Sequence, residues 1–98
     1  MKKNTKIKFD WNPGNIQKSF LKHRISNAEA ESMFYDQHLL VFLNLNHSKS
    51  ETRYICYVES NQNRILTSYF TFRKSNIRII GTRIANRKER VLYEDYKN

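Results

Sequence analysis

The sequence is poor in the residues that break or cross-link a chain: it contains two glycines, one proline and one cysteine among 98 residues. So little glycine and proline leaves no room for long linkers or low-complexity tails. A chain of this length can bury one modest core but not two. We therefore expect a single domain over residues 1–98, with residues 1–8 forming a polar, basic and flexible start.

The lone cysteine excludes a disulfide framework and a cysteine-based metal site. Cys56 lies in the segment TRYICYVES, where strand alternation places it on one face with Tyr54 and Val58. We interpret Cys56 as a small buried apolar residue, which is the usual place of an unpaired cysteine. A reducing compartment is consistent with this composition.

Long apolar runs are absent too. No stretch approaches the roughly 18 residues of a membrane span, and the basic start is not followed by the apolar segment of a signal peptide. We expect a cytoplasmic protein without a membrane partner. Glycine-rich phosphate loops and the HExxH, CxxC and nucleophile-elbow motifs are also missing. The three histidines are scattered, which argues against a metal or cofactor site: His23, His38 and His47.

Acidic residues are scarce relative to basic ones. The chain has 18 lysines and arginines against 9 aspartates and glutamates, a formal charge of +9. The basic residues gather in residues 2–24 and 64–90, while most acidic residues lie between 29 and 59 or at the C-terminus. This separation predicts a basic face that binds a polyanion or an acidic protein, although solvated surface charge explains it equally well.

The first helix is expected after the segment FDWNPGN. Asn12 and Pro13 suit a helix cap and first turn. Ile16 and Phe20, four residues apart, give this helix one apolar face, and it should end near residues 23–24.

A second helix is expected to open at Ser26. Ser26 and Glu29 match a capping box, in which each side chain bonds the backbone of the other, and Ile25 is placed to pack against Ala30. The polar pair at residues 36–37 should close this helix.

From residue 39 the apolar pattern changes from helical to alternating or continuous. Runs rich in β-branched and aromatic residues, separated by polar turns, predict a meander of strands. Their short connections require mostly antiparallel neighbours, and residues 7–9 are expected to add to a sheet edge. The expected strands are 39–43, interpreted as buried, then 52–59 after the loop 44–50, then 64–72, and a fourth that begins at 77.

The basic run after the fourth strand predicts a third helix. Asn86, followed three residues later by Glu89, matches a capping box at its start. The layout of two helices, a four-stranded mostly antiparallel sheet and a C-terminal helix indicates an α+β domain, with helices on the apolar face of the sheet.

Arg83 is the most informative charge in the sequence. It is separated from Ile77 and Ile79 by an even number of residues, so in a regular strand all three lie on one face. We therefore expect the guanidinium of Arg83 on the core-facing side, at the end of the strand. A charge at such a place needs an anionic partner.

The residue types that remain suit metal-free cleavage of RNA. The 2′-OH of RNA can attack the adjacent phosphorus, so that a protein need only align it, move protons and stabilise charge on the phosphorane. Arginine forks suit the last task. Arg53 shares one side of its strand with Ile55, so we expect Arg53 and Arg83 to converge at one edge of the sheet.

Two groups of residues extend this candidate site. His23 is the candidate for proton transfer, because imidazole titrates near neutral pH, and Lys22 beside it is the candidate electrostatic group. The arginines expected to bind RNA lie in the C-terminal basic block: Arg64, Arg78, Arg87 and Arg90.

Structural roles for the same residues stay open. Arg53 can pair with Glu51 or Glu59, and Arg83 with Glu89. A histidine at the C-terminal end of a helix can simply interact favourably with the helix dipole.

A series of motifs resembles the BrnT family of bacterial toxins over residues 9–94. They occur in order as FDWNPGN, KHRIS, MFYD, HS, ETRY, NRIL and IRIIGTRIANRKER with a following tyrosine. Lys22-His23 matches the helical motif of the family and Glu51-Thr52-Arg53 its strand motif. The most specific match is the closing signature, formed by Ile79-Ile80, Arg83, Ala85, Glu89 and Arg90.

The resemblance implies a RelE-like ribonuclease fold and translation arrest by RNA cleavage. In that site Arg53 and Arg83 would clamp the phosphate, with Glu89 or Tyr93 as assistants. It also implies a BrnA-like ribbon-helix-helix antitoxin, with operator DNA contacted only through the antitoxin. The assemblies open to the chain are a homodimer and a heterotetramer with that antitoxin.

Arg24 departs from the family pattern, which commonly has glycine after Lys-His. Arginine disfavours positive φ, so its presence argues against a left-handed helix end there. Two alternatives to a ribonuclease remain: a non-catalytic basic module that binds RNA or an acidic partner, and a structural partner of a DNA-binding antitoxin. Arg53, Arg83 and His23 gathered in one concave pocket would favour the enzyme.

Overall fold

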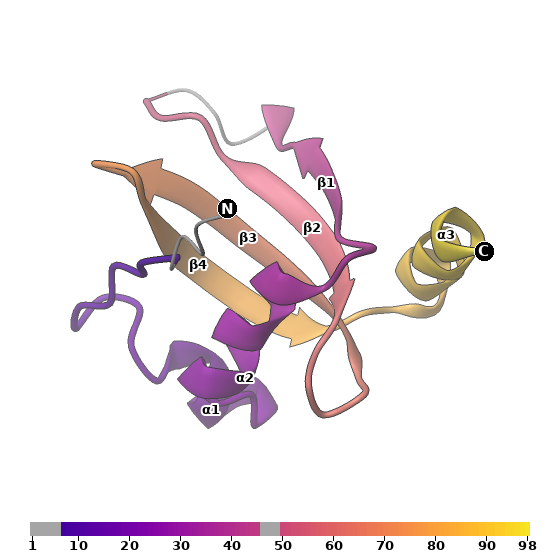
Figure 1. The fold of residues 1–98 in the computed structure, drawn as a ribbon. Coiled ribbons are helices and arrows are strands. Elements are labelled where there is room, and N and C mark those ends of the chain that lie inside the picture. Colours follow the sequence, from indigo (N-terminus) through magenta and orange to yellow (C-terminus); the bar gives the residue numbers. More distant parts are fainter. Residues whose placement is uncertain (1–6, 46–49) are drawn as a thin grey trace, which may run out of the picture.

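A computed structural model describes residues 7–45 and 50–98 of the chain. Its described part is a four-stranded antiparallel meander flanked by helices (Figure 1), which confirms the predicted α+β architecture. The elements are α1 (Lys18–His23), α2 (Asn27–Ser32), the 3-10 helix η1 (Met33–Tyr35), β1 (Leu40–Leu43), β2 (Tyr54–Glu59), β3 (Ile65–Arg73), β4 (Asn76–Ile84) and α3 (Arg87–Lys97). Residues 1–6 of the expected flexible start, and His47 in the expected loop, lie outside the described residues.

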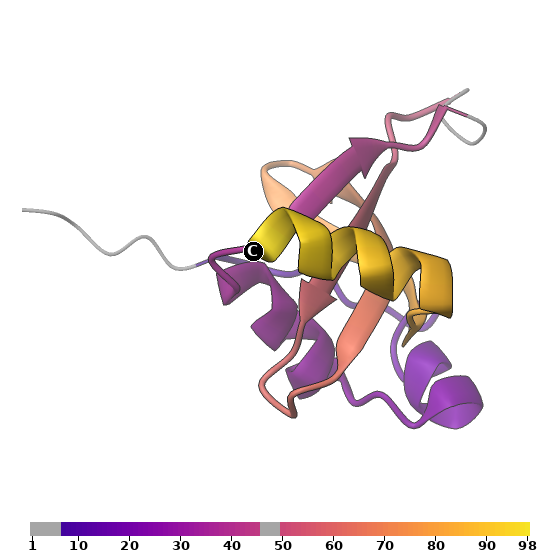
Figure 2. The same ribbon diagram turned by 90° about the vertical axis from the view of Figure 1, so that its right-hand side faces the viewer.

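The strands follow the order β1-β2-β3-β4, and each neighbouring pair is antiparallel. Phe9 forms a parallel bridge with Ile77 of β4, so the prediction that residues 7–9 add to a sheet edge is confirmed. α1 lies beside β4 and α2 in front of the sheet, whereas α3 lies apart from both, next to β2 (Figures 1 and 2).

One apolar cluster joins α2 and η1 to the sheet. Phe34 packs against the ring of Phe70 on β3 with ring centroids 5.1 Å apart, and against Phe9 at 5.7 Å. Cys56 is fully buried, as predicted, and burial raises the pKa of its thiol to about 12. The fully or nearly fully buried members are Ile25, Ala30, Met33, Cys56, Val58, Leu66, Phe70, Ile77 and Ile79.

The predicted start of the first helix is wrong. The Asn12 side chain accepts a hydrogen bond from the backbone N–H of Gly14 at 2.8 Å, and the Asn15 side chain accepts one from the N–H of Asn12 at 2.7 Å. Such local bonds from asparagine favour a turn over a helix. The helix therefore begins only at Lys18, and Phe20, part of its expected apolar face, is 42% exposed.

Arg24 ends α1 in the left-handed region with φ of 59°, contrary to the expectation from its side chain. Its backbone N–H donates to the carbonyl of Phe20 at 2.9 Å, and its own carbonyl accepts from Arg64 at 3.2 Å. We attribute the unfavourable φ to these bonds and to the burial of Ile25 directly after it.

The two predicted capping boxes differ. At α3 both halves form, because the Asn86 side chain accepts from the N–H of Glu89 and the Glu89 carboxylate accepts from the N–H of Asn86. At α2 only the first half forms: Ser26 accepts from the N–H of Glu29 at 3.0 Å. The Glu29 carboxylate instead binds Arg64, which lies directly before β3.

The prediction of a buried strand at 39–43 is also wrong. β1 pairs with β2 along one edge only, and Val41, Phe42 and Leu43 are exposed. Phe42 packs only partly, against the ring of Tyr57 on β2 with ring centroids 5.3 Å apart. The described helices include none long and apolar enough to cross a bilayer.

Candidate active site

An irregularity in β4 determines where its polar side chains point. Ile79 and Gly81 pair with consecutive residues of β3, so Ile80 between them is an extra residue. A bulge of this kind shifts all following side chains to the other face of the sheet. Ile79 faces the core, and Arg83 faces the opposite side. The prediction that Arg83 continues the core-facing row is therefore wrong.

Arg83 is held in a fixed orientation on that opposite face. Its Nη1 and Nη2 atoms donate to the two carboxylate oxygens of Glu89, each at 2.8 Å. Nη2 also donates to the hydroxyl of Tyr69 at 2.9 Å, and the guanidinium lies 5.8 Å from the centroid of that ring. The hydrogen bonds to Glu89 raise the pKa of Arg83 further, so its charge is permanent.

Glu89 holds two parts of the structure in place, the side chain of Arg83 and the first residues of α3. Its carboxylate accepts from the Thr67 hydroxyl at 2.8 Å and from the N–H of Asn86 at 2.9 Å. The hydrogen bonds from Arg83 lower the pKa of Glu89 to about 2, against the effect of burial. A carboxylate this acidic, bonded to so many donors, orients its neighbours and does not exchange protons near neutral pH.

Arg83 and α1 line a common pocket of about 190 Å³. The Ser19 hydroxyl of α1 accepts from the N–H of Thr82 at 2.9 Å, which fixes the helix against β4. This contact brings the side chains of α1 opposite the bulged end of the strand. The pocket is lined by Lys18, Ser19, Lys22, His23, Tyr69, Ile80, Gly81, Thr82 and Arg83.

A family model described as ribonuclease toxin, BrnT, of type II toxin-antitoxin system matches residues 11–89. The chain belongs to this family. No curated protein matches it. The match covers every residue that lines the pocket, together with Glu89 behind Arg83. Membership of the BrnT family implies an RNA substrate and an antitoxin partner.

The structure brings together only part of the predicted BrnT site. Lys22, His23 and Arg83 line one pocket, with Glu89 behind the arginine. Arg53 does not join them. Its neighbour Tyr54 pairs with residue 70 of β3, whereas Arg83 pairs with residue 67. Arg53 lies one residue beyond Tyr54, so the two arginines are offset by four residues, or about 13 Å, along the strands.

Arg53 and Arg83 each form an ion pair with a glutamate that the sequence offered as a structural partner. Arg53 lies 3.4 Å from the carboxylate of Glu51, and Arg83 binds Glu89. For Arg83 the pair lies at the wall of the pocket. For Arg53 it lies at the far end of the sheet, where Arg73 contacts the same glutamate at 3.5 Å.

Two of the expected RNA-binding arginines are engaged in contacts that hold the fold together. Arg64 donates to both carboxylate oxygens of Glu29 and to the carbonyl of Arg24, which ties β3 to α2 and to the end of α1. Arg78 is largely buried and contacts Asp10 at 3.8 Å and the side chain of Asn12 at 3.2 Å. These contacts anchor the N-terminal segment to β4.

The remaining predicted residues lie on α3. Arg87 and Arg90 are exposed there, and neither forms an ion pair with another described residue. Tyr93 is buried, and its hydroxyl donates to the carboxylate of Asp36 at 2.6 Å. Burial, together with this bond, raises the pKa of Tyr93. Its phenol is thus committed to holding α3 against the segment after η1.

Tyr69 is the pocket residue that the sequence did not single out. It lies in a strand rich in aromatic and hydroxyl side chains, and its pairing with Gly81 places it beside Arg83. The sequence feature that could have identified Tyr69 is its spacing of two residues from Thr67, which places both on one face of β3. Thr67 is the residue that pairs with Arg83. That signal can be read only once the bulge at Ile80 is known.

Within residues 7–45 and 50–98, no three histidine, cysteine or carboxylate side chains are grouped as metal ligands would be. The polar groups that line the pocket are ammonium, guanidinium, imidazole, phenol and hydroxyl groups. This set recognises an anion.

Proposed function

We propose that this BrnT family member is a metal-independent endoribonuclease whose active site is the pocket between α1 and the bulged end of β4. The observation that carries the proposal is the position of Arg83. Its charge is fixed at the wall of a concave site that Lys22 and His23 line from a different element. Positive groups converging from two sides suit a phosphodiester whose charge grows during attack.

In the proposed reaction the 2′-oxygen of the substrate attacks the adjacent phosphorus, and the bond to the 5′-oxygen of the next nucleotide breaks. The products are a 2′,3′-cyclic phosphate and a 5′-hydroxyl. Arg83 and Lys22 stabilise the phosphorane as charge develops on its oxygens. One group must take the proton of the 2′-OH and another must give a proton to the leaving oxygen.

His23 and Tyr69 are the groups in the pocket suited to these proton transfers. Imidazole accepts and donates protons near neutral pH. The Tyr69 hydroxyl already accepts a hydrogen bond from Arg83, which leaves its own proton available to an oxygen in the pocket. Glu89 contributes indirectly, by holding the guanidinium in one orientation.

The proposed partner of the toxin is a BrnA-like ribbon-helix-helix antitoxin. It would neutralise the ribonuclease in the cytoplasm and would carry the contact to operator DNA. The excess of basic residues in the chain favours an acidic, amphipathic segment of the antitoxin that folds on binding.

One observation favours a second function, that of a non-catalytic module that binds RNA or the antitoxin. The Glu89 carboxylate already occupies two donors of Arg83, which reduces the charge available to a phosphate. In that case RNA would bind through the surface cations without being cut.

The test is incubation of the purified chain with structured RNA in excess EDTA, beside Arg83→Ala. Arg73→Ala is the matched control, because Arg73 is an exposed arginine on β3 far from the pocket. We expect cleavage by the wild type and by Arg73→Ala, with 2′,3′-cyclic phosphate ends, and its loss in Arg83→Ala. Binding of intact RNA by all three proteins would support the non-catalytic module instead.

A further inference from the structure

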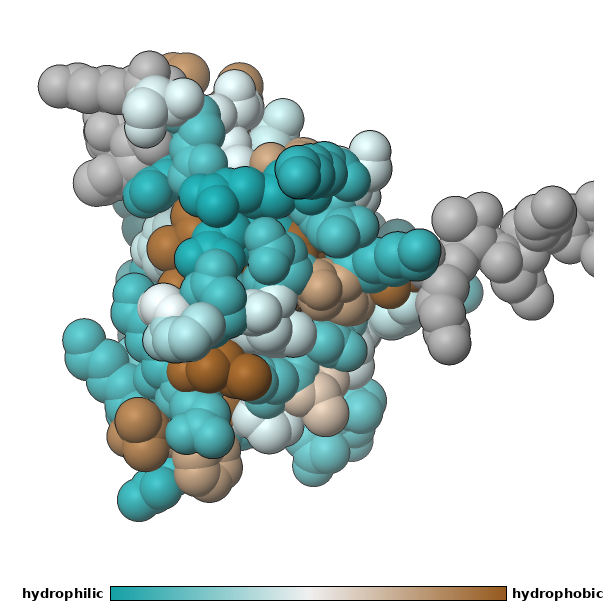
Figure 3. Space-filling model, turned by 90° about the vertical axis from the view of Figure 1, so that its left-hand side faces the viewer, coloured by the Kyte–Doolittle hydropathy of each residue, from teal (hydrophilic) through white to brown (hydrophobic). Residues whose placement is uncertain are grey.

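α1 presents apolar side chains to solvent on the side away from the pocket. Leu21 is 72% exposed and Phe20 is 42% exposed, and Ile16, which lies just before the helix, is exposed as well. The face of the molecule that includes α1 exposes hydrophobic residues among hydrophilic ones (Figure 3). A shallow cavity of about 320 Å³ opens here, lined by Gln17, Phe20, Leu21, Ser26 and Asn27.

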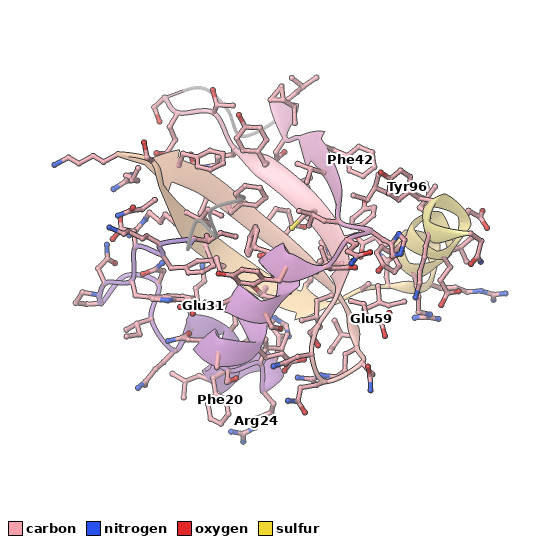
Figure 4. The ribbon with its side chains drawn as sticks, viewed as in Figure 1. Phe20, Arg24, Glu31, Phe42, Glu59 and Tyr96 are labelled. Atoms are coloured by element: carbon pink, nitrogen blue, oxygen red, sulfur yellow. The ribbon has the colours of Figure 1, made fainter. Side chains whose placement is uncertain are left out.

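Phe20 carries a cation over its ring. The guanidinium carbon of Arg24 lies 5.4 Å from the ring centroid, and the two side chains point outward together at the end of α1 (Figure 4). Arg24 makes no ion pair with a carboxylate among the described residues. Its backbone is fixed in the left-handed region by Phe20 and Arg64. An aromatic ring and a planar guanidinium are thus held together at the surface.

The same helix forms a wall of both cavities. Lys22 and His23 line the pocket on one side of α1, and Phe20 and Leu21 line the shallow cavity on the other. A helix with its side chains is about 10–12 Å thick. A single strand held at the pocket therefore needs only to pass the end of α1 to reach Phe20.

We propose that Phe20 and Arg24 form a stacking site for an unpaired base of the RNA strand whose phosphodiester occupies the pocket. Unpaired bases bind proteins by stacking on aromatic rings and on arginine planes. The charge favours this occupant, because Lys18 and Lys22 line the pocket and Arg24 lies over Phe20. The inference rests on the proposed function for the position of the scissile phosphate.

The test uses a short 2′-O-methyl oligonucleotide that carries 2-aminopurine, a base whose fluorescence falls when it stacks. This probe has no free 2′-OH and is not cut, so binding is measured apart from catalysis. Placing the fluorescent base at successive positions identifies the one that stacks. Phe20→Ala removes the ring, Phe20→Leu keeps most of the apolar volume without it, and Arg24→Gln removes the cation.

The matched control is Phe42→Ala. Phe42 is 41% exposed, close to the 42% of Phe20, and lies on β1 away from α1 (Figure 4). We expect Phe20→Ala to weaken binding roughly 5- to 150-fold, the range measured for loss of one stacked base. Phe20→Leu should lose the quenching as completely as the alanine variant, and Phe42→Ala should resemble the wild type.

Three other results would overturn the inference. Wild-type affinity and quenching in Phe20→Ala, with RNA cleavage intact, would reject the stacking site and leave the proposed ribonuclease standing. No binding of the probe by the wild type would reject the stacking site, and only the additional absence of RNA cleavage would reject the proposed ribonuclease with it. A partner protein that binds the wild type but not Phe20→Ala, while oligonucleotide binding is equal in both, would assign these side chains to a protein contact.

Discussion

Replacement of Glu89 by glutamine tests the contact on which the site geometry depends. The carboxylate of Glu89 is 12% exposed and accepts from Arg83, Thr67 and the N–H of Asn86. Breaking a buried ion pair costs about 3–5 kcal/mol. Because Arg83 is 31% exposed, water compensates part of this loss. Adding about 1 kcal/mol for the weakened helix cap, we expect Glu89→Gln to lower the free energy of unfolding by about 3 kcal/mol.

The pKa of Glu89 gives an independent estimate of the same contribution. It falls from the ordinary 4.5 to about 2 in the folded protein, a shift that corresponds to about 3 kcal/mol. A lowered pKa means that the stabilisation is fully present above pH 4.5 and is lost as the pH falls toward 2. Wild-type stability should therefore decline over that window, and the decline should be shallower in Glu89→Gln.

The assay is urea unfolding of both proteins over a pH series, with Glu94→Gln as the control for removing a charge from an exposed position of the same helix. In a thermal unfolding experiment at neutral pH, the melting temperature of Glu89→Gln should lie about 10–20 °C below that of the wild type. The reasoning would be refuted by a loss below about 0.5 kcal/mol, the size of an ordinary surface substitution, together with an unchanged pH profile.

Three further predictions concern residues outside the pocket. Tyr93→Phe removes the bond to Asp36 and should lower the free energy of unfolding by about 1–2 kcal/mol, while RNA cleavage per folded molecule stays at the wild-type rate; a large loss of cleavage would place its phenol in the reaction. Arg64→Gln leaves the buried Glu29 carboxylate without its cation and should cost about 2–3 kcal/mol in urea unfolding; Arg64→Lys should recover part of this, and equal stability of all three would contradict the structural role. Cys56 is buried with a pKa near 12, so a thiol reagent should modify it only as denaturant unfolds the chain; rapid modification of the native protein would show that this part of the core opens.

The elements that follow from local patterns were predictable from the sequence. The strand meander needed only alternation and short turns, and the capping box of α3 needed only Asn86 and Glu89. The first helix was placed too early because Asn15 bonds both the N–H of Asn12 and the carbonyl of Ile79 in β4, a contact with a residue far along the chain. Local spacing cannot reveal such a bond.

The site itself was only partly predictable for a related reason. Lys22, His23 and Arg83 were identified by residue type and by resemblance. Which of them share a pocket depends on the bulge at Ile80, which reverses the face of every later residue in β4. The sequence held one signal for the bulge, which the strand prediction did not use: Gly81 directly follows Ile80, and a glycine inside a strand often marks a bulge. Consequently Tyr69 was overlooked, and Arg53 was expected beside Arg83 although the register separates them.

The most direct test of this account is the rate of RNA cleavage by Arg83→Ala and Arg53→Ala under single-turnover conditions, in each case corrected for the folded fraction. Both variants remove one arginine that pairs with a glutamate, but only Arg83 lines the pocket. The account predicts that Arg83→Ala loses cleavage by about 100-fold or more, the usual cost of removing a group that stabilises the transition state, whereas Arg53→Ala stays within a few-fold of the wild type. Equal losses in the two variants, or a larger loss in Arg53→Ala, would contradict the assignment of the active site to this pocket.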